Sequence, residues 1–183
     1  MKRIKLVTMI ATLVIGAFTA SGATAATPSS PPQGRIAKQV RHELLTLPYY
    51  GVFDNLAYKV DGNTVTLYGQ VVHASTRSDA AARVSRLAGV SRVVNNIEVL
   101  PLSSMDNSIR LRTFRAIARM GGLNRYMMGA NPSIHIVVNH GQVSLEGVVD
   151  SSADRQLAYM AANQVSGVFS VTNNLRLESQ LPS

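Results

Sequence analysis

The sequence predicts an α+β protein made of two tandem α-β-β-α-β modules, each a small mixed three-stranded sheet with two helices on one face. Three observations support this fold. The chain repeats itself at a fixed offset, each copy contains paired runs of alternating apolar residues around a short turn, and segments of helical periodicity flank these runs. The 183 residues are enough for two small domains, and the 46% of hydrophobic residues can supply their cores.

The repeat is the strongest signal in the chain. A shift of 78 residues aligns two long stretches without a gap. The coinciding residues include the pairs Val65 and Val143, Leu67 and Leu145, Gly69 and Gly147, Val71 and Val149, Gly89 and Gly167, and Asn95 and Asn173. So many identities at one offset indicate a duplication.

Each copy is expected to begin with a helix. Copy one places apolar residues at helical spacing from Ile36 to Leu47, before a proline that ends the helix at Pro48. The counterpart in copy two runs from Ile109 to Met120 and is closed by Gly121-Gly122. The loop that follows this helix differs between the copies.

A hairpin is expected next. Copy one alternates apolar residues on both sides of Asp61-Gly62-Asn63, and copy two does so around Asn139-His140-Gly141. The alternation predicts that one sheet face is covered and the other is solvated. His135 alternates with Ile134 and Ile136 and is therefore expected on the solvated face.

A second helix and a last strand complete each copy. Ser75 or Thr76 is expected to cap the helix in copy one, and Ser151 or Ser152 in copy two. The glycines that follow these helices are expected to adopt left-handed conformations. The predicted buried stripes contain Ala80, Val84 and Leu87, and Ala158, Ala162 and Val165; the predicted strands are 93–100 and 171–177.

The N-terminus predicts export. Residues 1–25 combine a basic start, an apolar run from Leu6 to Phe18 and an A-x-A site at Ala23-Thr24-Ala25, the three parts of a signal peptide. An uncleaved N-terminal anchor is the alternative. Cleavage removes three basic residues and lowers the formal charge from +8 to +5, which favours anionic partners. A Pro/Ser-rich linker (26–34) and two domains (35–101 and 106–178) then follow. Export makes a nucleic-acid partner unexpected.

The repeated motifs resemble the BON domain. They are Gly-x-Val-x-Leu-x-Gly-like strands at 64–69 and 142–149, and Gly-Val-x-x-Val-x-Asn segments at 89–97 and 167–175. The whole arrangement is similar to the two-BON-domain periplasmic proteins of Gram-negative bacteria that osmotic stress induces. The resemblance implies periplasmic localisation and envelope maintenance through binding of phospholipid or another envelope component. The motif glycines and asparagines are interpreted as turn-shaping residues.

No residue pattern indicates catalysis. The four histidines lack metal-binding spacing, the serines lack a nucleophile elbow, and the carboxylates are scattered. We therefore expect a non-enzymatic protein without metal or other cofactor. The chain also has no cysteine, so its domains must be held by their cores.

One segment of copy two stands out by its charge. Residues 109–128 contain five arginines and no acidic residue, and Arg112, Arg115 and Arg119 recur on one helical face. The predicted lipid-binding residues are Arg112, Arg115, Arg119, Arg125, Tyr126, Met127 and Met128. A basic amphipathic helix beside aromatic and methionine side chains suits an anionic phospholipid surface. The alternative is an ordinary helix with solvated arginines and a core-facing apolar side.

Two functions follow as hypotheses. The first is a periplasmic envelope-maintenance protein that binds phospholipid or the membrane surface, in connection with osmotic or envelope stress. The second is a protein-interaction or chaperone-like module that supports envelope proteins through an exposed sheet face or the edge of a last strand.

Overall fold

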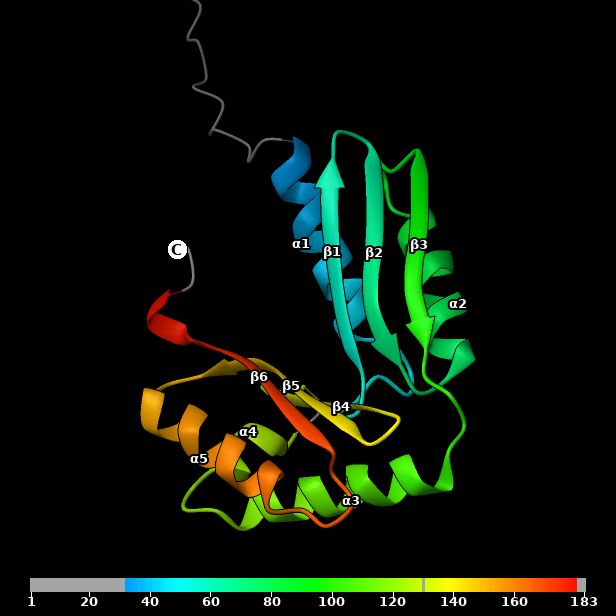
Figure 1. Ribbon diagram of the computed structural model, residues 1–183. Coiled ribbons are helices and arrows are strands. Elements are labelled where there is room, and N and C mark those ends of the chain that lie inside the picture. The colour runs from blue at the N-terminus through cyan, green and yellow to red at the C-terminus, as the bar shows by residue number, and fades with distance from the viewer. Residues whose placement is uncertain (1–31, 130, 181–183) are drawn as a thin grey trace, which may run out of the picture.

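The computed structural model describes residues 32–129 and 131–180, so the predicted signal peptide and linker residues 26–31 lie outside the described residues. The first domain follows the predicted order of elements (Figure 1). It contains α1 (Pro32–Leu45), β1 (Asn55–Asp61), β2 (Thr64–Val71), α2 (Ala74–Ser85) and β3 (Arg92–Val99).

The second domain repeats this order and adds two short helices. Its elements are α3 (Ser104–Arg119), α4 (Asn124–Met127), β4 (Ile134–Asn139), β5 (Gln142–Val149), α5 (Ser152–Asn163), β6 (Ser170–Leu177) and the 3-10 turn η1 (Glu178–Gln180). The α4 turn lies in the loop that differs between the two copies.

The two sheets have the same topology. In the first, β1 pairs antiparallel with β2 and β2 pairs parallel with β3; β4, β5 and β6 repeat this pattern. Both hairpins close through two-residue loops, at residues 62–63 and 140–141. The predicted α+β fold of two tandem modules is confirmed.

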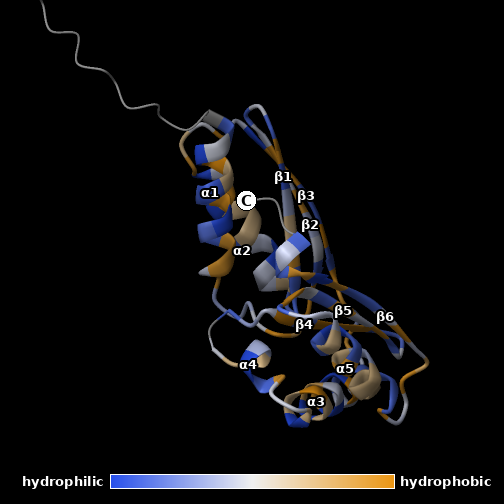
Figure 2. Ribbon diagram, turned by 90° about the vertical axis from the view of Figure 1, so that its left-hand side faces the viewer, coloured by the Kyte–Doolittle hydropathy of each residue, from blue (hydrophilic) through white to orange (hydrophobic). Residues whose placement is uncertain are grey.

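Each domain has its own apolar core between its sheet and its helices (Figure 2). The predicted stripes are buried there: Ala80, Val84, Ala158 and Ala162 are each 0% exposed. Leu87 and Val165, at the ends of the stripes, are partly buried. Periodicity therefore identified the correct face of each second helix.

Gly89 and Gly167 adopt the predicted left-handed conformation after the second helices, with φ of +92° and +88°. The motif glycines within the strands and the motif asparagines have a different role from the predicted one. Gly69 and Gly147 lie within β2 and β5 with φ of +111° and +118°, and a Cβ there would overlap the carbonyl oxygens of Asn55 and Ser133. These positions require glycine because the backbones approach each other there. The side-chain Nδ2 of Asn95 donates to Arg77 O at 3.0 Å, and its Oδ1 accepts from Ile97 N at 3.2 Å. The asparagines thus tie the last strand to the second helix instead of shaping turns.

Some predicted helix boundaries shift. Helix α1 includes residues 32–34, which were predicted to belong to the linker. The predicted cap of α2 is wrong, because the helix begins at Ala74 and follows His73, which makes no side-chain capping bond; Thr76 is buried within the helix. The cap of α5 is confirmed, since the Ser151 hydroxyl accepts from Asp154 N at 3.0 Å.

The two domains contact each other through the loop between α1 and β1. Val52 O accepts a hydrogen bond from Ile136 N of β4 at 2.7 Å, at the outer edge of the second sheet. Val52 and Phe53 also pack against the core cluster of the second domain. The Phe53 ring meets Phe114 of α3 at a centroid distance of 6.3 Å. One loop of the first domain thus contributes to the core and the sheet edge of the second domain. In Figure 1 the first sheet stands upright above the second domain.

His135 does not lie on a solvated face. Its Nδ1 lies 3.2 Å from Gly51 O, and its ring lies 5.5 Å from the ring of Tyr50. The prediction failed because alternation shows which side of a strand points away from its own core. It does not show that another domain covers that side.

Candidate functional site

The first turn of α3 is anchored by a buried carboxylate. Ser103 caps the helix by accepting from Asp106 N at 3.1 Å. The Asp106 side chain is 1% exposed and accepts from His140 N at 3.0 Å and Gly141 N at 2.8 Å. Helix α3 is therefore held against the turn between β4 and β5 by its own acidic residue.

The predicted arginine face lies beyond that anchor. Arg112, Arg115 and Arg119 are all exposed. Within the described residues, none of the three forms an ion pair with a carboxylate. Met105, 47% exposed, shares their helical stripe at the spacing i and i+7 from Arg112. We call Met105, Arg112, Arg115 and Arg119 the α3 stripe.

Arg110 separates from the other arginines. It is 3% exposed, and its guanidinium donates to Val138 O at 2.8 Å. Burial lowers the pKa of Arg110, although Asp106 and Asp54 act in the opposite direction. Arg110 is consequently a buried cation of the protein interior near the domain contact.

The remaining predicted residues are divided by burial. Tyr126 and Met127 are 5% and 4% exposed and belong to the core of the second domain, whereas Met128 is 65% exposed. Arg125 is exposed but lies 3.0 Å from Asp154 Oδ2 and 3.5 Å from Asp150 Oδ2. The structure therefore brings together the three arginines of α3 and leaves Tyr126 and Met127 away from the surface.

The Arg125 cluster is a structural network. The Tyr126 hydroxyl accepts from Arg125 Nη2 at 2.7 Å and from Asp150 N at 3.0 Å, and donates to Asp154 Oδ2 at 3.0 Å. The Ser151 hydroxyl, which also donates to Asp154, holds the pKa of this carboxyl below its ordinary value. These bonds fix the loop around α4 to the start of α5.

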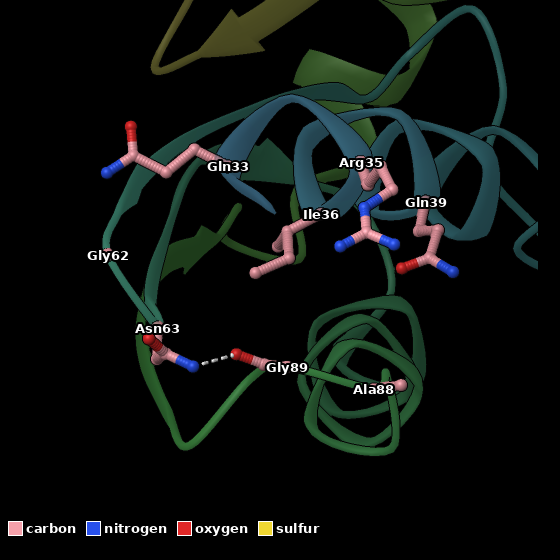
Figure 3. A pocket seen from close by; sticks show the side chains of 8 residues that line it. All are labelled: Gln33, Arg35, Ile36, Gln39, Gly62, Asn63, Ala88 and Gly89. Carbon is pink, nitrogen blue, oxygen red and sulfur yellow. Dashed lines mark hydrogen bonds between the residues drawn. The ribbon is translucent and has the colours of Figure 1, made fainter. Parts of the chain in front are cut away.

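A groove in the first domain was not predicted (Figure 3). It measures about 580 Å³ and lies between the start of α1, the β1–β2 turn and the loop after α2. Asn63 Nδ2 donates to Gly89 O across its end at 2.6 Å. The matching region of the second domain contains Asp106, bonded to its hairpin turn. The lining residues are Gln33, Arg35, Ile36, Gln39, Gly62, Asn63, Ala88 and Gly89.

A larger cleft of about 790 Å³ lies between the two domains. Arg41 and Tyr50 line it from the first domain, and His135, Glu146 and Arg176 from the second. The edge strand β1 contributes Asn55–Ala57 to its wall. No sequence signal could have located this cleft, because it depends on how the two domains dock.

The described residues contain no group of three or more histidine and acidic side chains placed to hold a metal ion. None of the described helices is long and apolar enough to cross a membrane.

The fold and the site define a tandem α+β repeat protein with a basic helical surface on its second copy. The family model of the BON domain matches residues 33–101 and 106–179, so the chain belongs to the BON domain family. BON domains are known for binding phospholipid or membranes, and their family is generally non-enzymatic and envelope-associated.

Two solved structures resemble the chain distantly. The C-terminal domain of CdsD, the structural protein of the type III secretion system of Chlamydia trachomatis, is 12% identical with a TM-score of 0.29. That match covers 79% of this chain and 96% of the other. A second structure of CdsD is 11% identical with a TM-score of 0.30, covering 81% and 93%. At these scores the likeness carries no functional argument. No curated relative matches the chain.

Proposed function

We propose that this chain is a non-enzymatic envelope protein of the periplasm that binds the surface of an anionic phospholipid membrane through the α3 stripe. The supporting observation is the exposure of Arg112, Arg115 and Arg119 on one helical face without carboxylate partners among the described residues. Each basic residue near an anionic membrane contributes about 1 kcal/mol, so three acting together give reversible attachment.

The burial of Tyr126 and Met127 sharpens the proposal. Neither side chain can reach a lipid without unfolding part of the core. Arg125 already interacts with two carboxylates, which offset its charge. The proposed contact surface therefore consists of the α3 stripe, with Met128 as a further exposed apolar side chain.

Vesicle co-sedimentation tests the proposal. The protein should bind vesicles rich in phosphatidylglycerol at low salt, bind phosphatidylcholine vesicles weakly, and dissociate at about 1 M salt, where the screening length falls to roughly 3 Å. Arg112→Glu with Arg115→Glu should abolish binding. The control is Lys59→Glu with Arg92→Glu, which makes the same charge change at exposed positions of the first domain. Equal loss in both double variants would reject the α3 stripe as the site.

The alternative function, a protein-interaction module, is favoured by one observation. The outer strand β1 presents residues Asn55–Ala57 to the interdomain cleft, where an extended segment of a partner could add to the sheet. Capture of an envelope protein that survives lipid removal and is lost when Ala57 is replaced by proline would support it.

A further inference from the structure

The loop between α5 and β6 presents an aromatic ring to solvent. Phe169 is 74% exposed. Its backbone N donates to Gly141 O at 2.9 Å, which fixes the loop to the β4–β5 turn. A single exposed ring is common on protein surfaces, so its role depends on what lies beside it.

The hairpin turn is shaped to hold this ring. Gly141 has φ of +75°, and a Cβ at this position would lie 2.5 Å from Cδ2 and 2.8 Å from Cε2 of Phe169. The ring can pack on the turn only because residue 141 has no side chain. One face of the ring is thus supported by backbone while most of the side chain remains exposed.

The ring lies beside the α3 stripe. A Cβ at Gly167, two residues before Phe169, would be 3.3 Å from Nη2 of Arg112, and one at Gly141 would be 3.4 Å from Gly167 O. Arg112 and Phe169 therefore flank the same short loop. The loop before β6 passes close to α3 in Figure 1.

The first domain shows that the fold does not require an exposed ring. Its equivalent backbone bond, from Ser91 N to Asn63 O, has the same length of 2.9 Å. Serine occupies the position of Phe169, and Asn63 occupies that of Gly141. The Asn63 amide closes the loop by donating to Gly89 O. The second domain lacks that polar closure and has a glycine and a phenylalanine instead.

We propose that Phe169 inserts into the boundary between headgroups and acyl chains of an anionic bilayer, while the arginines of the α3 stripe contact the lipid phosphates. This inference rests on the proposed function and deepens it. The charge of the stripe identifies the occupant as an anionic lipid surface, and the adjoining ring supplies apolar area that can be buried in it. Met105, at the start of the stripe, adds a second partly exposed apolar group.

The chain contains no tryptophan, which makes a direct test possible. Phe169→Trp places a single tryptophan at the proposed insertion point. On phosphatidylglycerol vesicles with brominated acyl chains, its emission should shift to the blue and be quenched. The matched control is Tyr49→Trp, at a residue that is 73% exposed in the first domain and should be neither shifted nor quenched.

Phe169→Ser, which installs the residue of the first domain, provides the second measurement. Its affinity for anionic vesicles should fall about ten- to a hundredfold, the value of burying one large apolar side chain. The remaining binding should keep its salt dependence. Circular dichroism and thermal unfolding should match the parent, since the ring makes little contact with the core.

The outcomes separate the two levels of the proposal. If the parent binds anionic vesicles but the tryptophan of Phe169→Trp is unquenched and Phe169→Ser binds equally well, insertion of Phe169 is rejected while the α3 stripe stands. If the parent fails to bind anionic vesicles at low salt, both proposals are rejected.

Discussion

The first and second domains share the same sheet topology but have different side chains at corresponding sites. Beside the hairpin turn, the first domain has a groove lined by Gln33 and Asn63. The second places Asp106 in the matching region and bonds it to the turn. After the hairpin, Val72 N donates to the Asp54 carboxylate, whereas Asp150 N donates to the Tyr126 hydroxyl. Duplication has preserved the hydrogen-bonding positions while the residues that serve them diverged.

The domains also differ in their cores, because the core of the second domain receives side chains from the first. The first contributes Val52 and Phe53 to the core region of the second. Burial raises the pKa of Asp54, a 3% exposed carboxylate in the same loop. The basic stripe and the exposed ring lie on the second domain. This difference indicates that the first domain supports the second, and it agrees with our proposal that the contact surface lies on the second.

The largest expected effect tests what the two domains share. Gly69→Ala and Gly147→Ala should each lower the free energy of unfolding by about 3–5 kcal/mol, because the added Cβ overlaps a carbonyl on the neighbouring strand. Urea denaturation measures the change. Gly121→Ala is the control, since nothing lies within 4 Å of its Cβ and its φ is not positive. A small effect at only one of the two strand positions would break the equivalence of the domains.

The next largest effect tests a difference between the two domains, the buried Asp106 carboxylate of the second. Asp106→Ala should cost about 3 kcal/mol, because it leaves two backbone N–H groups of the β4–β5 turn without their charged acceptor. Gln33→Ala, in the matching region of the first domain, should change stability by less than about 0.5 kcal/mol since its side chain is exposed. Similar losses in both variants would show that the anchor is not specific to the second domain.

A third variant tests the support that the first domain gives. Phe53→Ala should lower the stability of the second domain by about 2 kcal/mol, because the half-buried ring contacts Phe114 and the second core. Calorimetry should resolve an earlier unfolding transition. Tyr49→Ala removes a nearby aromatic side chain that is 73% exposed and should leave the transition unchanged. If the two variants unfold alike, the loop does not stabilise the second domain.

The smallest effect concerns pH at the domain contact. Burial lowers the pKa of His135 below its ordinary value near 6.5, although Asp54 and Glu146 act in the opposite direction. As pH falls below about 6.5, the unfolded chain takes up a proton that the native histidine does not. Native stability should therefore decrease until the lower native pKa is reached, by at most about 1.4 kcal/mol per pH unit.

Thermal unfolding between pH 7.5 and 5.5 measures this loss. His135→Gln should reduce this pH dependence relative to the parent. An unchanged pH profile in His135→Gln would show that burial of this histidine does not cause the loss of stability at low pH.

Much of the fold could be predicted from the chain alone. The spacing of Val65, Leu67 and Val71 placed a strand and its buried face correctly, since each is 0% exposed. The candidate site was predicted only in part. Arg112, Arg115 and Arg119 lie together on the exposed face of α3. Arg110 and Tyr126 are buried, and each forms hydrogen bonds with residues 24 to 28 positions away in the sequence. Such distant partners leave no local pattern.

The sequence by itself determined the duplication, the order of elements and the inward faces, because periodicity records which side of a helix or strand avoids water. Tertiary structure alone decided which charges are neutralised and which remain free. It joined Asp106 to the hairpin turn, covered His135 with Tyr50, and left Phe169 exposed beside Arg112. These relations depend on segments brought together by packing, and the energy of a charge or a ring depends on what surrounds it in space.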